Sequence, residues 1–411
     1  LASYTFDFFC QKSVFKKVKR KMEKSKSMQN APWTAMSLLF LAHFVVDSQV
    51  SFLAPLLPYL REKFEISLAT AGILISLQAF CVTASQPLTA LITDRFPHLP
   101  WLAIGLIGSS FFITAMGWLP LYSAVVISIP LGGFLAGLAH PDMGSRAGSL
   151  SEDHRTLAVS VYVSGGRLGF SIGPIIALFI VDSLGMEFLW IYVLINIILV
   201  YGIMKGLPKP SAITNRDSTI LMGLRKALFS AGLPLVILLG VTISRSIVTV
   251  NLQGLLPTLY VERGIGLWQG GIANSVLLFF GMFGVILGGV LADLLGKKKL
   301  IITGMLTALI GLVGFLMSSP IVALVFLSIL GLGMYMPMGV SMAYAQEFLP
   351  EHRGFASSLT LGVSWGFASF SVIPITNIAE SIGLMNAFWF LPLALVLALF
   401  LAFCLPKESI N

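Results

Sequence analysis

The amino-acid sequence predicts an all-α membrane protein of twelve transmembrane helices, arranged in two six-helix, pseudo-symmetric halves. Three observations lead to this fold class. The 411-residue chain is 56% hydrophobic and only 11% charged, whereas a soluble domain carries about 25% charged residues. Apolar runs recur along it, each long enough for the roughly 20 helical residues that cross a hydrocarbon core. The third observation is an internal repeat.

The repeat relates one half of the chain to the other. The segment 57–60 (Leu-Pro-Tyr-Leu) returns as 256–259 (Leu-Pro-Thr-Leu), and Asp94, at the end of an apolar run, returns as Asp293. Two copies of one membrane unit are the organisation of secondary transporters. The repeat therefore indicates transport before any single residue is considered.

The predicted elements follow in chain order. A basic tail (1–32) precedes the N-terminal bundle (33–206), a cytoplasmic linker (207–230), the C-terminal bundle (231–404) and a short C-terminus (405–411). The apolar runs place the spans at 33–60, 67–93, 99–118, 120–147, 155–182, 186–206, 231–260, 267–293, 298–318, 320–347, 353–381 and 385–404.

The basic residues predict the orientation. Most of the 26 Lys and Arg residues fall in the tail, the even-numbered loops and the C-terminus, and only Arg61, Lys63 and Arg263 fall on the opposite side. Because positive charge stays in the cytoplasm, both termini should be cytoplasmic. The net charge of +8 then reflects topology, and no nucleic-acid partner is expected. Lysines between Lys12 and Lys26 should attract the tail to anionic lipid.

The linker is predicted from prolines and polar residues, including Pro208 and Pro210, which are typical of flexible connections. Catalytic and metal motifs are missing from the sequence. The three cysteines are isolated, and we find no P-loop, no paired catalytic carboxylates and no zinc spacing. We therefore expect neither an enzyme nor a resident metal or cofactor.

Two loops and one span carry motifs. A gating motif is predicted in the loops after the second and eighth spans, at Asp94, Arg95, Gly289, Asp293, Gly296 and Lys297. Its aspartates can lie against the positive end of a helix from the other half, while its basic residues hold the loop in the cytoplasm. A simple helix cap in a positively charged loop is the alternative. In the fifth span, Gly169, Gly173 and Pro174 allow close helix approach and a bend at the interface between the halves; ordinary small-residue packing is the alternative.

These motifs resemble those of the major facilitator superfamily. The loop Gly289–Lys299 resembles its signature loop, and Gly169-x-x-x-Gly173-Pro174 resembles its antiporter motif. Further segments resemble the fosmidomycin-resistance branch, a group of bacterial inner-membrane efflux proteins: 43–47, 85–87, 140–141, 164–169, 245–246 and 361–366. The resemblance covers most of residues 33–404 and implies the major facilitator fold, export, and a cytoplasmic gate latched by the signature loop. Arg167 departs from the neutral residue, often Asn, that this branch is expected to have.

Ionisable groups inside spans are costly and are functional candidates. Asp47 lies about 21 Å along the helix from Trp33, near mid-bilayer. We predict that Asp47 binds the coupling proton and that His43, one turn earlier, and His140 share or relay it. The alternative is a permanent ion pair between Asp47 and Arg167 with neutral, structural histidines.

The predicted substrate-binding residues are of three kinds. Arg245 and Arg167 could hold an anionic group, although Arg245 could instead compete for the charge of the proton site. Neutral hydrogen bonds and adaptable apolar contacts are expected from Gln78, Asn251, Gln253, Met338 and Trp365. Plain helix packing would explain these neutral residues almost as well.

Three functions remain open at this point. The first is a proton-coupled antiporter that exports a small drug-like, amphipathic or anionic molecule by alternating access. The second is a proton-coupled symporter that imports an organic anion, with Arg245 and Arg167 binding it. The third is a non-transporting membrane scaffold or receptor. The expected partners are protons, a small-molecule substrate and the lipid bilayer, and the expected state is a monomer in the bacterial inner membrane.

Overall fold

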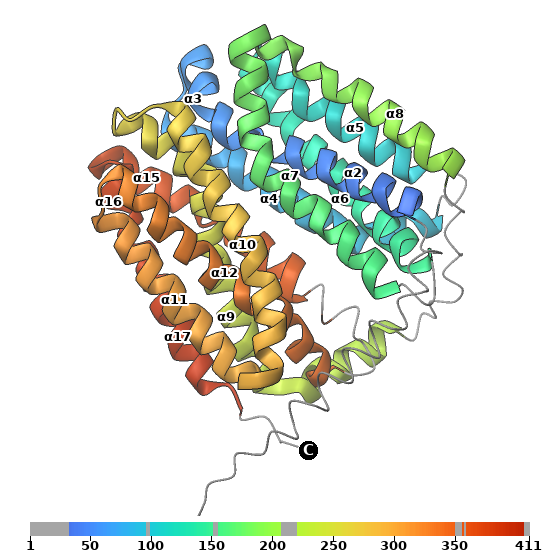
Figure 1. Cartoon of the computed structure of the whole chain (residues 1–411), viewed down its shortest axis with the longest axis vertical. Helices are drawn as coiled ribbons and strands as arrows, with labels where there is room; N and C mark the ends of the chain where they lie inside the picture. The colour runs from blue at the N-terminus through green and yellow to red at the C-terminus, as the bar shows by residue number, and fades with distance from the viewer. Residues whose placement is uncertain are drawn as a thin grey trace, which may run out of the picture.

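A computed structural model describes residues 33–95, 99–150, 155–206, 220–349, 356 and 359–406. The basic tail (1–32), much of the linker and the end of the C-terminus lie outside these described residues. The helices form two bundles that lie side by side (Figure 1). The N-terminal bundle comprises α2 (Trp33–Val50), α3 (Leu53–Phe64), α4 (Leu68–Arg95), α5 (Trp101–Thr114), α6 (Tyr122–Ser149), α7 (Arg155–Leu184) and α8 (Ile191–Gly206).

The C-terminal bundle contains the second set of six spans. It comprises α9 (Ile220–Glu262), α10 (Leu267–Leu295), α11 (Lys297–Met317), α12 (Pro320–Phe348), α14 (Ser364–Ser369), α15 (Val372–Ile382), α16 (Leu384–Phe388) and α17 (Leu391–Cys404). Short non-α turns join some of these helices: η2 (Ala115–Gly117), η3 (Met186–Trp190) and the π-helical η5 (Leu359–Val363).

The predicted fold class is confirmed. Ten helical stretches of the described chain are long and apolar enough to cross a membrane, and Trp101–Gly117 is a shorter apolar one. Within the remaining predicted span, 353–381, the described residues form the interrupted run of η5, α14 and α15. Two details differ from prediction: the first span is divided into α2 and α3, and α9 begins at Ile220, inside the segment for which a linker is predicted. Gly232, with φ 51°, lies at a kink in α9.

Small residues let the helices approach closely. A side chain at Gly284 or Gly288 of α10 would collide with the backbone of Leu332 or Met336 in α12. In lipid, helix association depends on such van der Waals contact because the surroundings are already apolar. Large apolar side chains such as Ile127, Phe179 and Ile321 are exposed, as expected for surfaces covered by acyl chains.

The two bundles meet at one end and spread apart toward the other (Figure 1). We call the meeting end the far end; there α3 joins α4 and α9 joins α10. The opposite, linker end is where α8 ends at Gly206 and α17 ends at Cys404. Polar contacts cross between the bundles at the far end. Arg61 Nη1 lies 3.3 Å from Glu262 Oε1, the backbone N–H of Ala69 donates to Glu380 Oε1 at 2.9 Å, and Trp268 Nε1 donates to Asp182.

Reversing a charge in the far-end contacts should open this end. Arg61→Glu places two carboxylates opposite each other. It should raise the ratio of molecules with an open far end to molecules with a closed one roughly fivefold, since partly exposed pairs contribute about 1 kcal/mol. The double variant Arg61→Glu/Glu262→Arg should restore the original population. Distances between spin labels on the α3–α4 and α9–α10 loops would report it. Equal distributions in all three proteins would contradict a role for this pair in closure.

Candidate functional site

A cavity of about 350 Å³ lies between the two bundles. Helices of both halves line it, among them α2, α4, α6 and α7 on one side and α9, α10 and α12 on the other. Eight predicted site residues line this cavity: His43, Asp47, Gln78, His140, Arg167, Gln253, Met338 and Trp365. Arg245 and Asn251 are not among the lining residues.

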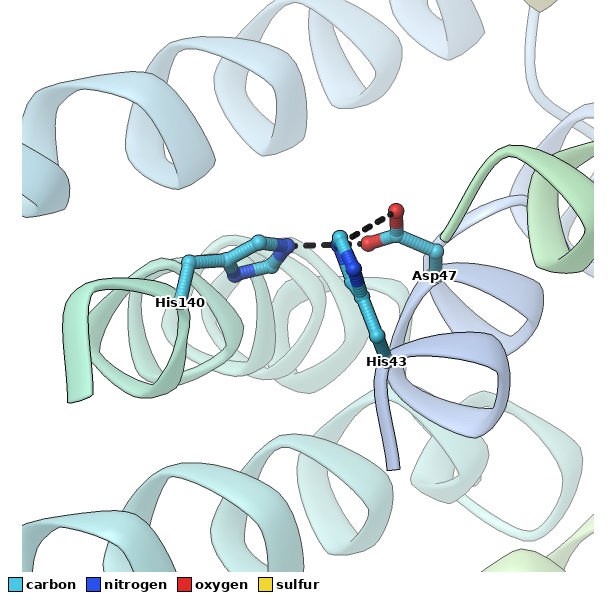
Figure 2. A group of neighbouring side chains, drawn as sticks. All are labelled: His43, Asp47 and His140. Atoms are coloured by element: carbon cyan, nitrogen blue, oxygen red, sulfur yellow. Dashed lines mark hydrogen bonds and ion pairs between the residues drawn. The ribbon is translucent and has the colours of Figure 1, made fainter. Parts of the chain in front are cut away.

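Asp47 contacts two histidines, one through each carboxylate oxygen (Figure 2). His43 Nε2 is 3.2 Å from Asp47 Oδ2, and His140 Nε2 is 3.0 Å from Asp47 Oδ1. His43 and Asp47 are one turn apart on α2, so they share a helix face, while His140 comes from α6. The Asp47 side chain is only 9% exposed. We call these three residues the His–Asp–His cluster.

Backbone carbonyls hold both imidazole rings at the nitrogen that points away from Asp47. His43 Nδ1 donates to the Tyr162 carbonyl at 2.8 Å, and His140 Nδ1 donates to the Ala136 carbonyl at 2.7 Å. The Tyr162 ring stacks on His43 with centroids 4.1 Å apart, and its hydroxyl donates to the His140 carbonyl at 3.1 Å. Tyr162 is not among the predicted site residues, because nothing in the sequence distinguishes it from an ordinary aromatic residue of a span.

Gly166 completes the wall of the cluster. A Cβ at this position would collide with Asp47 Oδ2 and His43 Nε2. Only glycine therefore leaves room for the cluster at this point of α7. The sequence feature that could have identified Gly166 is the glycine pair at 165–166, but close packing was predicted only for Gly169 and Gly173.

Arg167 does not pair with Asp47 in this structure. Its Nη2 lies 3.1 Å from Met338 Sδ, and its guanidinium lies over the Tyr335 ring at 5.4 Å from the centroid. Arg167 thus extends from α7 toward α12 of the other bundle. This conformation therefore does not contain the ion pair between Asp47 and Arg167 that was the alternative.

Arg245 is buried behind the cavity wall at 1% exposure. Its Nη1 donates to the Met334 carbonyl at 3.1 Å and its Nη2 to Ser246 Oγ at 3.3 Å, while Nε has no hydrogen-bond partner in the described structure. The charges of Arg245 and Arg167 act on each other and on Tyr335. No carboxylate of the described chain lies within ion-pair distance of either guanidinium. This region of the wall is therefore strongly positive.

The neutral candidates have different surroundings. Gln253 donates to the Tyr335 hydroxyl, and Asn251 donates to Ser371 Oγ at 2.8 Å, which joins α9 to the region between α14 and α15. Gln78 Nε2 and Trp365 Nε1 are buried with no hydrogen-bond partner in the part of the chain that is described. Asn251 thus takes part in helix packing, whereas Gln253, Gln78 and Trp365 border the cavity.

The signature loop begins at the end of α10. Gly296 adopts φ 82°, in the left-handed region that favours glycine. Lys297 Nζ lies 2.7 Å from Glu347 Oε1 of α12, and Lys298 Nζ donates to the carbonyls of Phe403 and Leu405 at the end of α17. These contacts lie within the C-terminal bundle, and a cation suits the negative end of a helix.

The other members of the gating motif are less fully described. A Cβ at Gly289 would meet nothing within 4 Å, so this glycine borders open space here. Asp94, Arg95 and Asp293 lie in the last turns of α4 and α10, but their side chains lie outside the described part of the structure. The latch across the halves therefore stays a prediction.

The glycines of the fifth span face α2. A side chain at Gly165 or Gly169 would collide with the backbone carbonyls of Phe40 or Phe44, and one at Gly173 with Ser48 and Ser51. Together they fit α7 against the helix that carries His43 and Asp47. This close approach lies within the N-terminal bundle, and the bend predicted at Pro174, at the interface between the halves, stays a prediction. At that interface α7 contacts α10, where Ser171 Oγ donates to the Ser275 carbonyl at 3.1 Å.

Comparisons with known proteins agree with this architecture. A model of the Major Facilitator Superfamily matches residues 39–374. The chain is 26% identical over 404 residues to the uncharacterized MFS-type transporter YfnC of Bacillus subtilis, which covers 94% of this chain and 97% of YfnC. It is 25% identical over 394 residues to the fosmidomycin resistance protein of Escherichia coli, covering 89% and 92% of the two chains.

Solved structures share the fold at low sequence identity. The nucleoside transporter NupG superposes with a TM-score of 0.75 at 14% identity, covering 91% of this chain and all of NupG. A D-xylose–proton symporter gives a TM-score of 0.74 at 16% identity, with 92% and 98% covered. A bacterial homologue of the lysosomal transporter Spinster, in an inward-facing and unoccupied conformation, gives 0.74 at 14% identity, with 91% and 96% covered.

Proposed function

The chain belongs to the major facilitator superfamily, and on that premise we propose that it is a proton-coupled antiporter that exports a small amphipathic or anionic molecule. Membership of this family makes it a multi-pass membrane transporter and not an enzyme. The observation that carries the proposal is the His–Asp–His cluster in the wall of the cavity. A carboxylate at membrane depth is costly and is therefore a candidate for function, and this one contacts two imidazoles, each of which can take up or release a proton.

The positive wall supports an anionic group on the substrate. Arg167 borders the cavity and Arg245 lies behind it, without a carboxylate partner in the described chain. A buried guanidinium without a counter-ion favours an incoming anion. Much of the remaining lining is apolar, including Phe170, Val250 and Leu278, which suits an amphipathic, drug-like molecule. The name of the fosmidomycin resistance protein also supports export.

The conformation supports loading from the linker end. If positive charge places the linker, both termini and the signature loop in the cytoplasm of a bacterium, the far-end contacts between Arg61 and Glu262 and between Ala69 and Glu380 close the outer face. An exporter loads its substrate in such a state. Exchange with an outward-open state by rocking of the halves would complete the cycle.

Transport in proteoliposomes with an imposed pH gradient tests the proposal. Candidate substrates are toxic phosphonates, other organic anions and hydrophobic cations. Antiport predicts that substrate and protons move in opposite directions, so a reversed gradient reverses substrate flux. Movement in the same direction would identify a symporter and contradict export by antiport. Absence of flux for every compound, with the protein correctly folded, would favour a scaffold or receptor.

Arg167→Gln should selectively weaken the binding of anions. A charge-assisted hydrogen bond contributes about 1.5–3 kcal/mol, so the half-saturating concentration of an anionic substrate should rise roughly tenfold to 150-fold. Uncharged or cationic substrates should be affected little. Arg167→Lys should lose less than the Gln variant, and Arg263→Gln, at an exposed position of the far end, is the matched control. Equal losses for anions and cations would contradict the assignment.

A further inference from the structure

We propose that Tyr335 is a positioning residue: its ring holds the Arg167 guanidinium on the α12 side of the cavity, away from Asp47, where the charge is free to bind an anionic group of the substrate. This inference rests on the proposed function and deepens it by naming the residue that directs the anion-binding charge. Arg167 and Asp47 both line the cavity, whereas Tyr335 is not among its lining residues. Tyr335 therefore acts through Arg167 and not by touching the substrate.

The Arg167 guanidinium makes two weak contacts with α12. It lies over the Tyr335 ring at 5.4 Å from the centroid, within the roughly 6 Å over which a cation and an aromatic face attract each other. Its Nη2 donates to Met338 Sδ at 3.1 Å, and a thioether is a weak acceptor. Neither contact neutralises the charge. No other hydrogen-bond acceptor for Arg167 occurs among the described residues, so the remaining N–H donors of the guanidinium are left for the oxygens of a ligand.

Two neighbouring helices fix the Tyr335 side chain. The residue is only 2% exposed, and its hydroxyl accepts a hydrogen bond from Gln253 Nε2 of α9. A Cβ at Gly281 of α10 would collide with the ring, so the ring fills the space that this glycine leaves. The ring is therefore held in one orientation, with a face turned to Arg167. Since Tyr335 belongs to the C-terminal bundle and Arg167 to the N-terminal one, their contact joins the two bundles.

Arg167 has an alternative partner in Asp47. A Cβ at Gly166 would collide with Asp47 Oδ2, and consecutive Cα atoms are about 3.8 Å apart, so the Arg167 Cα lies within about 8 Å of that oxygen. An extended arginine side chain covers this distance, and opposite charges attract strongly in low-dielectric surroundings. The guanidinium is nevertheless directed toward α12. The contacts with Tyr335 and Met338, together with the two imidazoles that already contact Asp47, account for this direction.

The direction of Arg167 decides whether the cavity can bind an anion. If the guanidinium were paired with Asp47, the carboxylate would neutralise its charge and occupy its donors. Directed toward α12, it has no carboxylate partner in the described chain, and such a cation favours an incoming anion. Removal of the Tyr335 ring should therefore weaken the binding of anions and affect uncharged substrates much less.

The direction of Arg167 can be measured without any substrate. We would record ¹H–¹⁵N spectra of the arginine side chains in the full-length protein and assign Arg167 as the Nε–H signal that is lost in Arg167→Gln. An aromatic ring shifts the signals of protons over its face to lower frequency. We expect this shift in the unaltered protein and in Tyr335→Phe, which keeps the ring, and its loss in Tyr335→Leu. The signal in Tyr335→Leu/Asp47→Asn should differ from that in Tyr335→Leu, because the carboxylate that pairs with the released guanidinium is gone.

Three results would contradict a positioning role of the Tyr335 ring. They are an Arg167 signal in Tyr335→Leu that matches the unaltered protein, loss of the shift in Tyr335→Phe, and identical signals in Tyr335→Leu with and without Asp47→Asn. Gly281→Ala keeps the tyrosine but displaces its ring, so it should move the Arg167 signal in the same direction even if Tyr335→Leu does not fold. None of these spectra needs a transported compound, so failure of the proposed function remains distinguishable.

Where an anionic substrate is found, transport tests whether Tyr335 acts through Arg167. Tyr335→Leu should raise the half-saturating concentration of the anion roughly threefold to 30-fold, but less than about twofold in Arg167→Gln, where the charge is already absent. Tyr260→Leu removes an equally buried tyrosine of α9, 2% exposed and outside the cavity lining, and should leave the preference for anions unchanged. An equal effect of Tyr335→Leu with and without Arg167 would overturn the positioning role.

Discussion

Asp47→Asn is expected to reduce pH-driven substrate transport to the level of protein-free liposomes. The amide has nearly the shape of the carboxyl group, so α2 and its packing on α7 should persist. It cannot bind and release a proton in the working range, and it offers the two imidazoles a single oxygen where the carboxylate offers two. Substrate exchange without a gradient should survive, since it does not need the proton to be released. The measurement compares gradient-driven uptake with exchange in the same vesicles.

Two variants control this experiment. Glu187→Gln removes a carboxylate from an exposed position in η3, away from the cavity, and should leave pH-driven transport unchanged. Asp47→Glu keeps the titratable group but lengthens it, and should retain part of the coupling. If Asp47→Asn still responded to the pH gradient as the unaltered protein does, the coupling carboxylate would have to lie elsewhere.

Gly166→Ala is expected to impair coupling without unfolding the protein. The added methyl group would overlap Asp47 Oδ2 and His43 Nε2, and both side chains would have to move. Inserting a methyl group into a packed site costs about 1–3 kcal/mol, so the pH-driven rate should fall roughly fivefold to 150-fold. The clash is with the ends of two side chains and not with backbone, so thermal stability should fall much less than activity.

The matched control is Gly339→Ala in α12. A Cβ at Gly339 meets nothing within 4 Å, and alanine is a better helix former than glycine, so this variant should be as active as the unaltered protein. Normal pH-driven transport by Gly166→Ala would show that the cluster tolerates displacement of its side chains. The close packing of Asp47 and His43 against Gly166 would then no longer support a role of the cluster in coupling.

Much of the fold was predictable because the hydropathy of a segment indicates whether it lies inside the bilayer. Twelve apolar runs and the repeat that relates 57–60 to 256–259 were sufficient for two six-helix bundles, and the fold is confirmed by the helices and the family match. The broken first span was missed, although Pro55 lies four residues after Ser51 and removes the backbone N–H that would donate to the Ser51 carbonyl in a continuous helix. The early start of α9 was missed because the polar part of the predicted linker lies before Ile220, whereas 220–230 is largely apolar and carries two charges, Arg225 and Lys226.

Part of the candidate site was also predictable. Asp47 and His43 are four residues apart, so their contact follows from helix geometry. For His140, only the depth in the bilayer could be predicted. Its contact with Asp47 depends on how α6 packs against α2, and the direction of Arg167, away from Asp47 and toward Met338, depends on the rotation of α7. Arg245, which was predicted to bind the substrate, lies behind the cavity wall because the rotation of its helix also depends on packing.

The composition of each span, its depth in the bilayer and the residues costly enough to imply function all follow from the sequence. Which of those residues face one another follows only from how the helices pack. The physical reason is that the free energy of placing a residue in a bilayer depends steeply on depth, whereas a helix that is apolar on all sides has no preferred rotation about its axis. Close contacts fix that rotation here, as where Gly165, Gly169 and Gly173 seat α7 on α2 and turn Gly166 toward the carboxylate.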